Sequence, residues 1–299
     1  MEKTIITSTY GTRAKVAHLE VNRLLSNRYT QAVGPFVFLD HLLPSQQAPK
    51  IPQAPTGEFA HPHRGIATFT YLFSGSLEHY DSNGNHGIVE AGGAQWMKAG
   101  NGVIHDENPS PQFQLEGGTL HALQFWINLP AKNKAESPEY LALHPQNVPQ
   151  LVLPNNAGTL RIIIGTFEDK TSPVKTYSKQ FLYHLQLKAG ASFTLDTRAG
   201  WEYAAFIPQE EVISNSSPHG NSELLVFSPD EAPVIFSNPG AALADIMLFG
   251  GEPYREPMVA QGPFIMNSRL EIAEAYEDYF NGRYGQIEYK ATAGVQAQF

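Results

Sequence analysis

The sequence predicts an all-β protein in which short strands close into barrels. Runs of β-branched and aromatic residues recur along the chain, separated by turn-forming segments. Glycine and proline are dense, at 25 and 22 residues, which is typical of a fold with many turns. The 299 residues, 42% of them hydrophobic, suffice for two ordinary domains or one large β domain. The clearest strands are predicted at residues 67–73, 120–129, 160–164, 181–187, 201–207 and 224–227.

The chain divides at a polar, proline-spotted stretch between two β-rich regions of similar size. We interpret residues 1–132 as an N-terminal barrel, residues 133–155 as a linker, and residues 156–299 as a second barrel. The similar sizes of the two regions suggest a duplicated barrel.

One helix is predicted near the C-terminus, at about residues 268–281. Ser268 and Glu271 form a capping box at its start, and Gly282 stands where a helix should stop. We expect this helix to serve packing.

Composition excludes several classes of function. The net charge is −9, and lysine and arginine form no cluster, so we expect no direct contact with nucleic acid. The chain has no cysteine, which excludes disulfides, thiolate zinc sites and cysteine nucleophiles. The first residues are charged rather than apolar, and no run approaches the roughly 20 apolar residues of a membrane span. A cytoplasmic protein without a membrane partner is therefore expected.

Two short motifs carry the chemistry. His61 and His63 are two residues apart, so an extended chain presents both imidazoles on one face, and Pro62 stiffens the pair. His105 and Glu107 have the same spacing. If the two strands meet inside a barrel, three imidazoles and one carboxylate converge. These donors suit one divalent ion, Fe(II), Mn(II), Ni(II), Cu(II) or Zn(II), and leave two octahedral positions open.

Other candidate residues have two interpretations each. His79 and Asp81 share a face and either orient a ligand imidazole or, as we prefer, order the hairpin loop that follows. Arg64 either binds an anionic substrate or covers the barrel mouth. Five aromatic residues either line a pocket above the metal or, as we prefer, pack in the core; they are Phe69, Tyr71, Phe73, Trp96 and Phe125. We interpret the following histidines as structural: His18, His41, His86, His144, His184 and His219.

The motifs resemble those of the pirin family, in the cupin superfamily, and of its bacterial pirin-like members. The resemblance is carried by His-Pro-His-Arg-Gly at residues 61–65 and by the continuous segment 95–107 that ends in His105, Asp106 and Glu107. Further similar segments span nearly the whole chain, at residues 38–41, 123–130, 250–253 and 262–267.

This resemblance implies two stacked cupin barrels, each a double-stranded β-helix or jelly roll, with a short C-terminal helix. It also implies one metal ion, usually iron, in the N-terminal barrel only, held by His61, His63, His105 and Glu107. One departure is that the family commonly carries a glutamate four residues after the second histidine, where this chain has Ala67. This departure removes any acid–base or ligand-orienting role for a carboxylate from the first motif.

The resemblance further implies an oxidoreductase, a quercetin 2,3-dioxygenase that cleaves a flavonol with dioxygen and releases carbon monoxide. Its substrate would be a small, flavonol-like aromatic molecule, and Glu107 would be the catalytic base. The alternative is a metal- or redox-dependent regulatory protein without turnover, whose partner is a transcription factor or a metabolic enzyme. We favour the enzyme. A purely structural metal is a weaker third interpretation, because closed sites are normally four-coordinate zinc with sulfur ligands.

Overall fold

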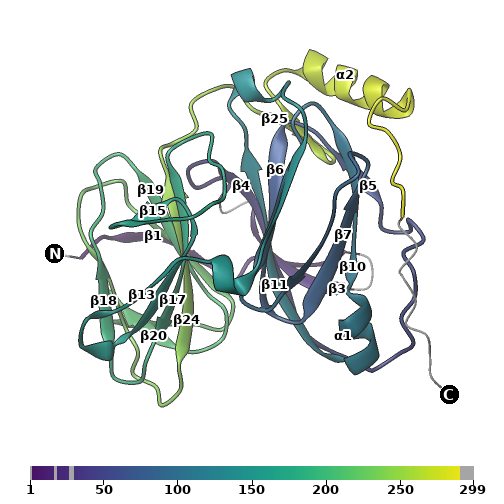
Figure 1. Ribbon diagram of the computed structural model, residues 1–299. Coiled ribbons are helices and arrows are strands. Elements are labelled where there is room, and N and C mark those ends of the chain that lie inside the picture. Colours follow the sequence, from purple (N-terminus) through teal and green to yellow (C-terminus); the bar gives the residue numbers. More distant parts are fainter. Residues whose placement is uncertain (1, 17–18, 27–29, 290–299) are drawn as a thin grey trace.

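The computed structural model describes residues 2–16, 19–26 and 30–289, which leaves His18 outside the described residues. In the described part, the chain forms two β-barrels that lie side by side (Figure 1). Each barrel combines one seven-stranded and one four-stranded sheet. The predicted all-β fold with two barrels is confirmed.

The N-terminal barrel pairs its large sheet, in the order β12-β9-β6-β11-β4-β3-β2, with a small sheet in the order β5-β10-β7-β8. Helix α1 (Pro111–Glu116) connects two of these strands and is capped by Ser110, whose side chain accepts a hydrogen bond from the backbone N–H of Phe113. The strands are β2 (Thr12–Val16), β3 (Leu19–Leu25), β4 (Phe36–Gln47), β5 (His61–His63), β6 (Ile66–Ser74), β7 (Ser76–Asp81), β8 (His86–Glu90), β9 (Ala94–Lys98), β10 (Val103–Pro109), β11 (Gly118–Asn128) and β12 (Glu139–Leu143).

The C-terminal barrel pairs a sheet in the order β1-β22-β19-β24-β17-β14-β13 with one in the order β18-β23-β20-β21. Its strands are β1 (Ile5–Thr9), β13 (Gln150–Val152), β14 (Gly158–Ile164), β17 (Gln180–Leu187), β18 (Ser192–Leu195), β19 (Glu202–Ile207), β20 (Val212–Ser214), β21 (Ser217–His219), β22 (Glu223–Phe227), β23 (Val234–Ser237) and β24 (Ala244–Gly251). Two short ribbons complete the strands, β15 (Thr166–Phe167) with β16 (Lys170–Thr171) and β25 (Val259–Gln261) with β26 (Phe264–Met266).

The sheets cross the expected domain boundaries in two places. Strand β1 lies within the expected N-terminal domain but pairs with β22 of the other barrel. The expected linker supplies β12 to the first barrel and β13 to the second, with short 3-10 turns at Ala131–Asn133, Pro145–Asn147 and Pro154–Asn156. Composition does not reveal such strand exchange, because an edge strand looks the same whichever sheet it joins. The division into 1–132, 133–155 and 156–299 therefore stays a proposal.

Strand alternation gives the large sheet of the N-terminal barrel two different faces. On β11, Phe125 and Ile127 pack in an apolar core shared by both barrels, whereas Gln124 and Trp126 line a cavity inside the N-terminal barrel. The shared core centres on Phe36, Phe125 and Phe249, whose ring centroids lie 5.2–5.6 Å apart in edge-to-face pairs. Phe249 comes from β24, so this cluster joins the barrels.

A second contact between the barrels is polar and buried. The Nε2 atoms of His41 and His121 lie 2.7 Å apart, and Nδ1 of His41 lies 2.7 Å from the hydroxyl of Ser222 in the other barrel. Close by, His184 bridges the Tyr71 hydroxyl and Asp245 at 2.7 and 2.8 Å. These contacts agree with the prediction that His41 and His184 have structural roles.

The C-terminal helix α2 (Arg269–Phe280) is confirmed, with Ser268 as its N-cap accepting from the backbone N–H of Glu271 at 3.2 Å. Although it follows the second barrel in sequence, α2 lies over the first barrel beside β25 and β26 (Figure 1). Ile272 and Ala275 pack against Phe264 of β26. Among the described residues, no helix has the length and apolar character needed to cross a membrane.

We predict that Phe249→Ala destabilises the protein by about 3–5 kcal/mol, because it opens a cavity among fully buried rings that join the barrels. Urea denaturation measures the change. Phe280→Ala is the control, since that ring is 78% exposed, and we expect a change within about 0.5 kcal/mol. Equal effects of the two substitutions would contradict the assigned core.

The buried histidine pair also predicts how stability depends on pH. Burial lowers the pKa of His41 to about 3, with further contributions from the nearby His121 and Arg13, and burial lowers the pKa of His121 to about 4 against an opposing effect of Asp245. The unfolded chain, whose histidines titrate near 6.5, therefore binds more protons below that pH. The free energy of unfolding should fall as pH drops from about 6.5 to 5, by up to about 1.4 kcal/mol per pH unit for each ring.

Urea unfolding at each pH, with a chelator present, tests this prediction. The double substitution His41→Asn and His121→Asn should reduce the slope, because only other buried rings such as His63 and His105 then contribute, whereas His144→Ala, which removes an exposed ring, should leave it unchanged. If the free energy of unfolding has the same slope against pH in the unaltered protein, the double variant and His144→Ala, the His41–His121 pair is not the source of the slope.

Candidate metal centre

The predicted motifs occupy two paired strands. Strand β5 holds His61 and His63, and it runs antiparallel to β10 with His105 opposite His61 and Val103 opposite His63. Gly65 follows directly, with a φ of +79°, and a Cβ there would lie 2.0 Å from the carbonyl oxygen of Ile265. Only glycine therefore allows the C-terminal segment to approach the motif this closely.

The three imidazoles converge as the spacing predicts. Their ring centroids are 4.8 Å apart for His61 and His63, 4.4 Å for His61 and His105, and 5.0 Å for His63 and His105. The Nε2 atoms of His61 and His105 lie 3.1 Å apart. His63 and His105 are each 1% exposed, whereas His61 is exposed. The three residues offer nitrogen atoms that all lie within 4.8 Å of one another.

Backbone carbonyls orient two of the rings. His61 Nδ1 lies 2.8 Å from the carbonyl oxygen of Phe59, and His63 Nδ1 lies 3.1 Å from that of Pro263. A carbonyl oxygen can only accept, so both Nδ1 atoms carry the proton and both Nε2 atoms keep a lone pair. Metal-binding histidines are held in this way. The donor set therefore fits a divalent metal.

The charge state of the rings also suits a metal. Burial lowers the pKa of His63 and of His105 well below the usual range, and the neighbouring His61 adds to both shifts. Neutral imidazoles are the form that binds metals. His105 Nδ1 is buried and has no hydrogen-bond partner among the described residues.

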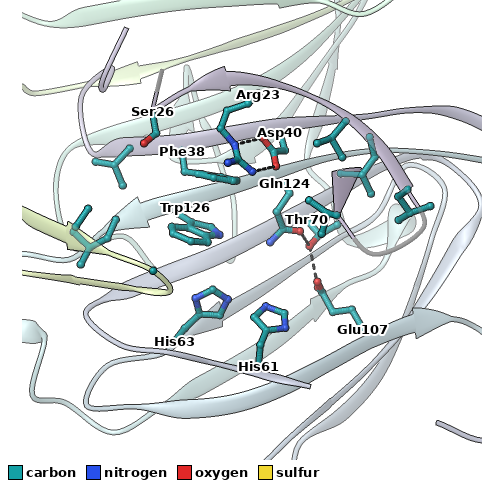
Figure 2. Close-up of a pocket in the computed structure, with 18 of the residues that line it drawn as sticks. Arg23, Ser26, Phe38, Asp40, His61, His63, Thr70, Glu107, Gln124 and Trp126 are labelled. Atoms are coloured by element: carbon teal, nitrogen blue, oxygen red, sulfur yellow. Dashed lines mark hydrogen bonds and ion pairs between the residues drawn. The ribbon is translucent and has the colours of Figure 1, made fainter. Parts of the chain in front are cut away.

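Glu107 lines the same cavity as His61 and His63, but its carboxylate is held elsewhere (Figure 2). Its Oε1 atom lies 3.1 Å from the Thr70 hydroxyl and accepts a hydrogen bond from the Gln95 side chain. Its ligand atom falls within 4.8 Å of those of His79 and His105, not of all three clustered imidazoles. The role of Glu107 as fourth ligand therefore stays a prediction.

Asp81 orders the hairpin loop, as we preferred, whereas His79 lies beside the candidate donors His105 and Glu107. The carboxylate of Asp81 accepts hydrogen bonds from the backbone N–H groups of Asn83 and Asn85, and thus orders the hairpin loop. His79 lies 3.3 Å from Asp81 and stacks on Tyr140 at 4.2 Å. The register also places His79 directly opposite Glu107, and spacing within one strand cannot show this cross-strand neighbour.

Arg64 does not line the cavity, although it follows the motif directly. Its Nη1 atom binds Asp278 of α2 at 2.6 Å and lies 3.4 Å from the Tyr284 hydroxyl. This residue therefore anchors the C-terminal helix, so its interpretation as a residue that binds an anionic substrate finds no support in this geometry.

His61 and His63 line a cavity of about 710 Å³ inside the N-terminal barrel. Its aromatic lining comes from Phe38, Phe59 and Trp126, with Phe38 and Trp126 stacked at 4.3 Å. The five aromatic residues considered earlier pack in the shared core or against it, as preferred. Ala67 also belongs to that core, so a glutamate there would face the second barrel instead of the cavity. Cavities of this size and apolar character suit small aromatic ligands.

Comparisons with known proteins bear on the fold and on the site. Residues 18–127 match the Pirin family, and residues 182–285 match the Pirin C-terminal cupin domain. A Pseudomonas aeruginosa protein provisionally named quercetin 2,3-dioxygenase is 34% identical over 259 residues, which cover 86% of this chain and 89% of that protein. A tomato (Solanum lycopersicum) pirin-like protein is 33% identical over 268 residues, 89% of this chain and 87% of its own length.

The crystal structure of a quercetin 2,3-dioxygenase from Acinetobacter baumannii superposes with a TM-score of 0.88. The two chains are 28% identical, and the match covers 96% of this chain and all of that one. The two barrels are therefore cupin barrels, as the resemblance implied.

We predict that the purified protein binds about one divalent ion per chain and that His63→Ala or His105→Ala lowers this occupancy several-fold, because each removes a buried nitrogen donor. Elemental analysis after dialysis against trace metal measures occupancy. His144→Ala, at an exposed ring outside the cluster, should bind metal as the unaltered protein does. Unchanged occupancy in both cluster variants would refute the assigned donor set.

Proposed function

The chain belongs to the pirin family, and on that premise we propose that it is a metal-dependent dioxygenase acting on flavonols such as quercetin. The observation that carries the proposal is that two carbonyl-oriented imidazoles, His61 and His63, open on an aromatic-lined cavity with a carboxylate on its wall. In the proposed reaction the substrate is cleaved with dioxygen and carbon monoxide is released.

We propose His61, His63, His105 and Glu107 as the residues that hold one divalent ion, with Fe(II) as the first candidate. Mn(II), Ni(II), Cu(II) and Zn(II) suit the same nitrogen and oxygen donors. When bound, such an ion is a Lewis acid that lowers the pKa of a hydroxyl group on the substrate.

Glu107 is proposed as the base that accepts the proton of this hydroxyl group at a carboxylate oxygen. The Thr70 hydroxyl and the Gln95 amide lie at its Oε1 atom and restrict the direction of the carboxylate. Gln124 lies 2.6 Å from the Thr70 hydroxyl and extends the network. Proton transfer needs such positioning, because a base acts only within hydrogen-bond reach of the proton.

The aromatic residues of the cavity wall favour a planar substrate. Trp126 lies 5.0 Å from His63 with its ring at 74° to the imidazole, and Phe38 stacks on Trp126. An apolar wall beside the donors excludes water and strengthens electrostatic interactions at the reacting group. A regulatory protein without turnover would need the same donors but not a cavity of this size, which is why we favour the enzyme.

We predict that the protein loaded separately with Fe(II), Mn(II), Ni(II), Cu(II) or Zn(II) consumes quercetin in air with at least one of these metals. Loss of the flavonol absorbance and release of carbon monoxide measure the reaction. Glu107→Gln should lower kcat by about 100-fold or more at equal metal occupancy, because the amide cannot accept the proton.

His144→Ala serves as the control and should retain turnover. A Glu107→Gln variant with full metal and full activity would contradict the role of Glu107. Full metal occupancy without turnover of any flavonol would instead favour the regulatory protein.

A further inference from the structure

An ion pair lies on the wall of the cavity opposite the imidazoles. Arg23 on β3 and Asp40 on β4 are cross-strand partners, and their side chains form two parallel hydrogen bonds of 2.9 Å (Nε to Oδ1) and 2.8 Å (Nη2 to Oδ2). Both residues line the cavity. The side chain of Asp40 is 4% exposed and that of Arg23 is 33% exposed.

A continuous aromatic wall connects this pair to the candidate metal donors. The guanidinium carbon of Arg23 lies 4.5 Å from the ring centroid of Phe38, Phe38 stacks on Trp126, and Trp126 contacts His63. Figure 2 shows Trp126 and Phe38 in sequence between His63 and Arg23. A flat molecule lying along this wall would therefore have one end at the imidazoles and the other at the ion pair.

Stability of the fold does not by itself explain why an ion pair lies at this position. Burial raises the pKa of Asp40 although Arg23 opposes the shift, so the carboxylate is desolvated. Because Arg23 is one-third exposed, the pair is only partly buried, and such a pair adds little to stability. Most of the surrounding cavity wall is apolar, and ligand cavities of this composition use a few polar groups to fix the ligand.

We propose that the Arg23–Asp40 pair recognises neutral hydroxyl groups at the far end of a planar aromatic ligand whose other end reaches the imidazoles. The inference rests on the proposed function and names the part of the substrate that the chain selects. A phenolic hydroxyl can donate to a carboxylate oxygen of Asp40 and accept from the guanidinium of Arg23. An anionic group at this end is disfavoured, because Asp40 already neutralises Arg23 and would repel it.

Two flavonols test the proposal. Quercetin carries two hydroxyl groups on its phenyl substituent, and galangin carries none, while both share the same hydroxyl and keto groups on the fused rings. Calorimetric titration of zinc-loaded protein under nitrogen measures binding without turnover. We expect quercetin to bind about tenfold more tightly than galangin, the effect of one hydrogen bond to a charged group.

The double substitution Arg23→Met and Asp40→Leu should bring the ratio of dissociation constants to about one while galangin binding is retained. The matched control is Arg13→Met with Glu20→Leu, which removes an exposed ion pair between β2 and β3 and should keep the tenfold ratio. If the double variant does not fold, Asp40→Asn keeps the side-chain shape and should still reduce the ratio several-fold.

A ratio near one in the unaltered protein, no binding of either flavonol, or a tenfold ratio that survives both Asp40→Asn and the double substitution would overturn the proposal. Failure of the proposed function gives a different result. In that case quercetin is not consumed in air, but the dissociation constants still distinguish the two flavonols and still depend on the pair.

Discussion

The site depends on the antiparallel register between β5 and β10. With His105 opposite His61, both motifs present their alternate residues to the same side, and the three imidazoles meet. Because side chains alternate along a strand, a slip of one residue would turn the histidines of one strand away from those of the other. Pro62 restricts the backbone of β5, and Gly65 allows the C-terminal segment to approach closely, so the local sequence supports the register that the chemistry requires.

The same alternation gives the two faces of the large sheet different roles. One face of β6 and β11 supplies the apolar core that joins the barrels, and the other face supplies the cavity. The residues of one face are therefore constrained by packing, and those of the other face by the shape of the cavity. Substitutions at Phe125 act on stability, whereas substitutions at Trp126, its neighbour in the chain, act on the ligand cavity.

Local spacing was enough to predict the β fold class, the capped helix and the two pairs, His61 with His63 and His105 with Glu107, that each share one face of a strand. Each of these follows from a period that lies within one short segment, such as His61 with His63 or Ser268 with Glu271. The sequence alone could not predict the features that depend on contacts between distant segments. Phe38 and Trp126 come from different strands and meet only in the folded sheet. The exchange of β1 into the second barrel is of the same kind.

The carbonyl group of Pro263 shows why the second barrel matters to a site that lies in the first. The chain leaves β24, returns across the first barrel, and places this carbonyl 3.1 Å from His63, 200 residues away. The buried Lys134 fastens the returning segment by binding the carbonyl oxygens of Gly65 and Ile265 at 3.0 and 2.6 Å. Orientation of a candidate metal ligand therefore depends on the chain beyond the second barrel, although the clustered candidate donors of the described residues lie in the first.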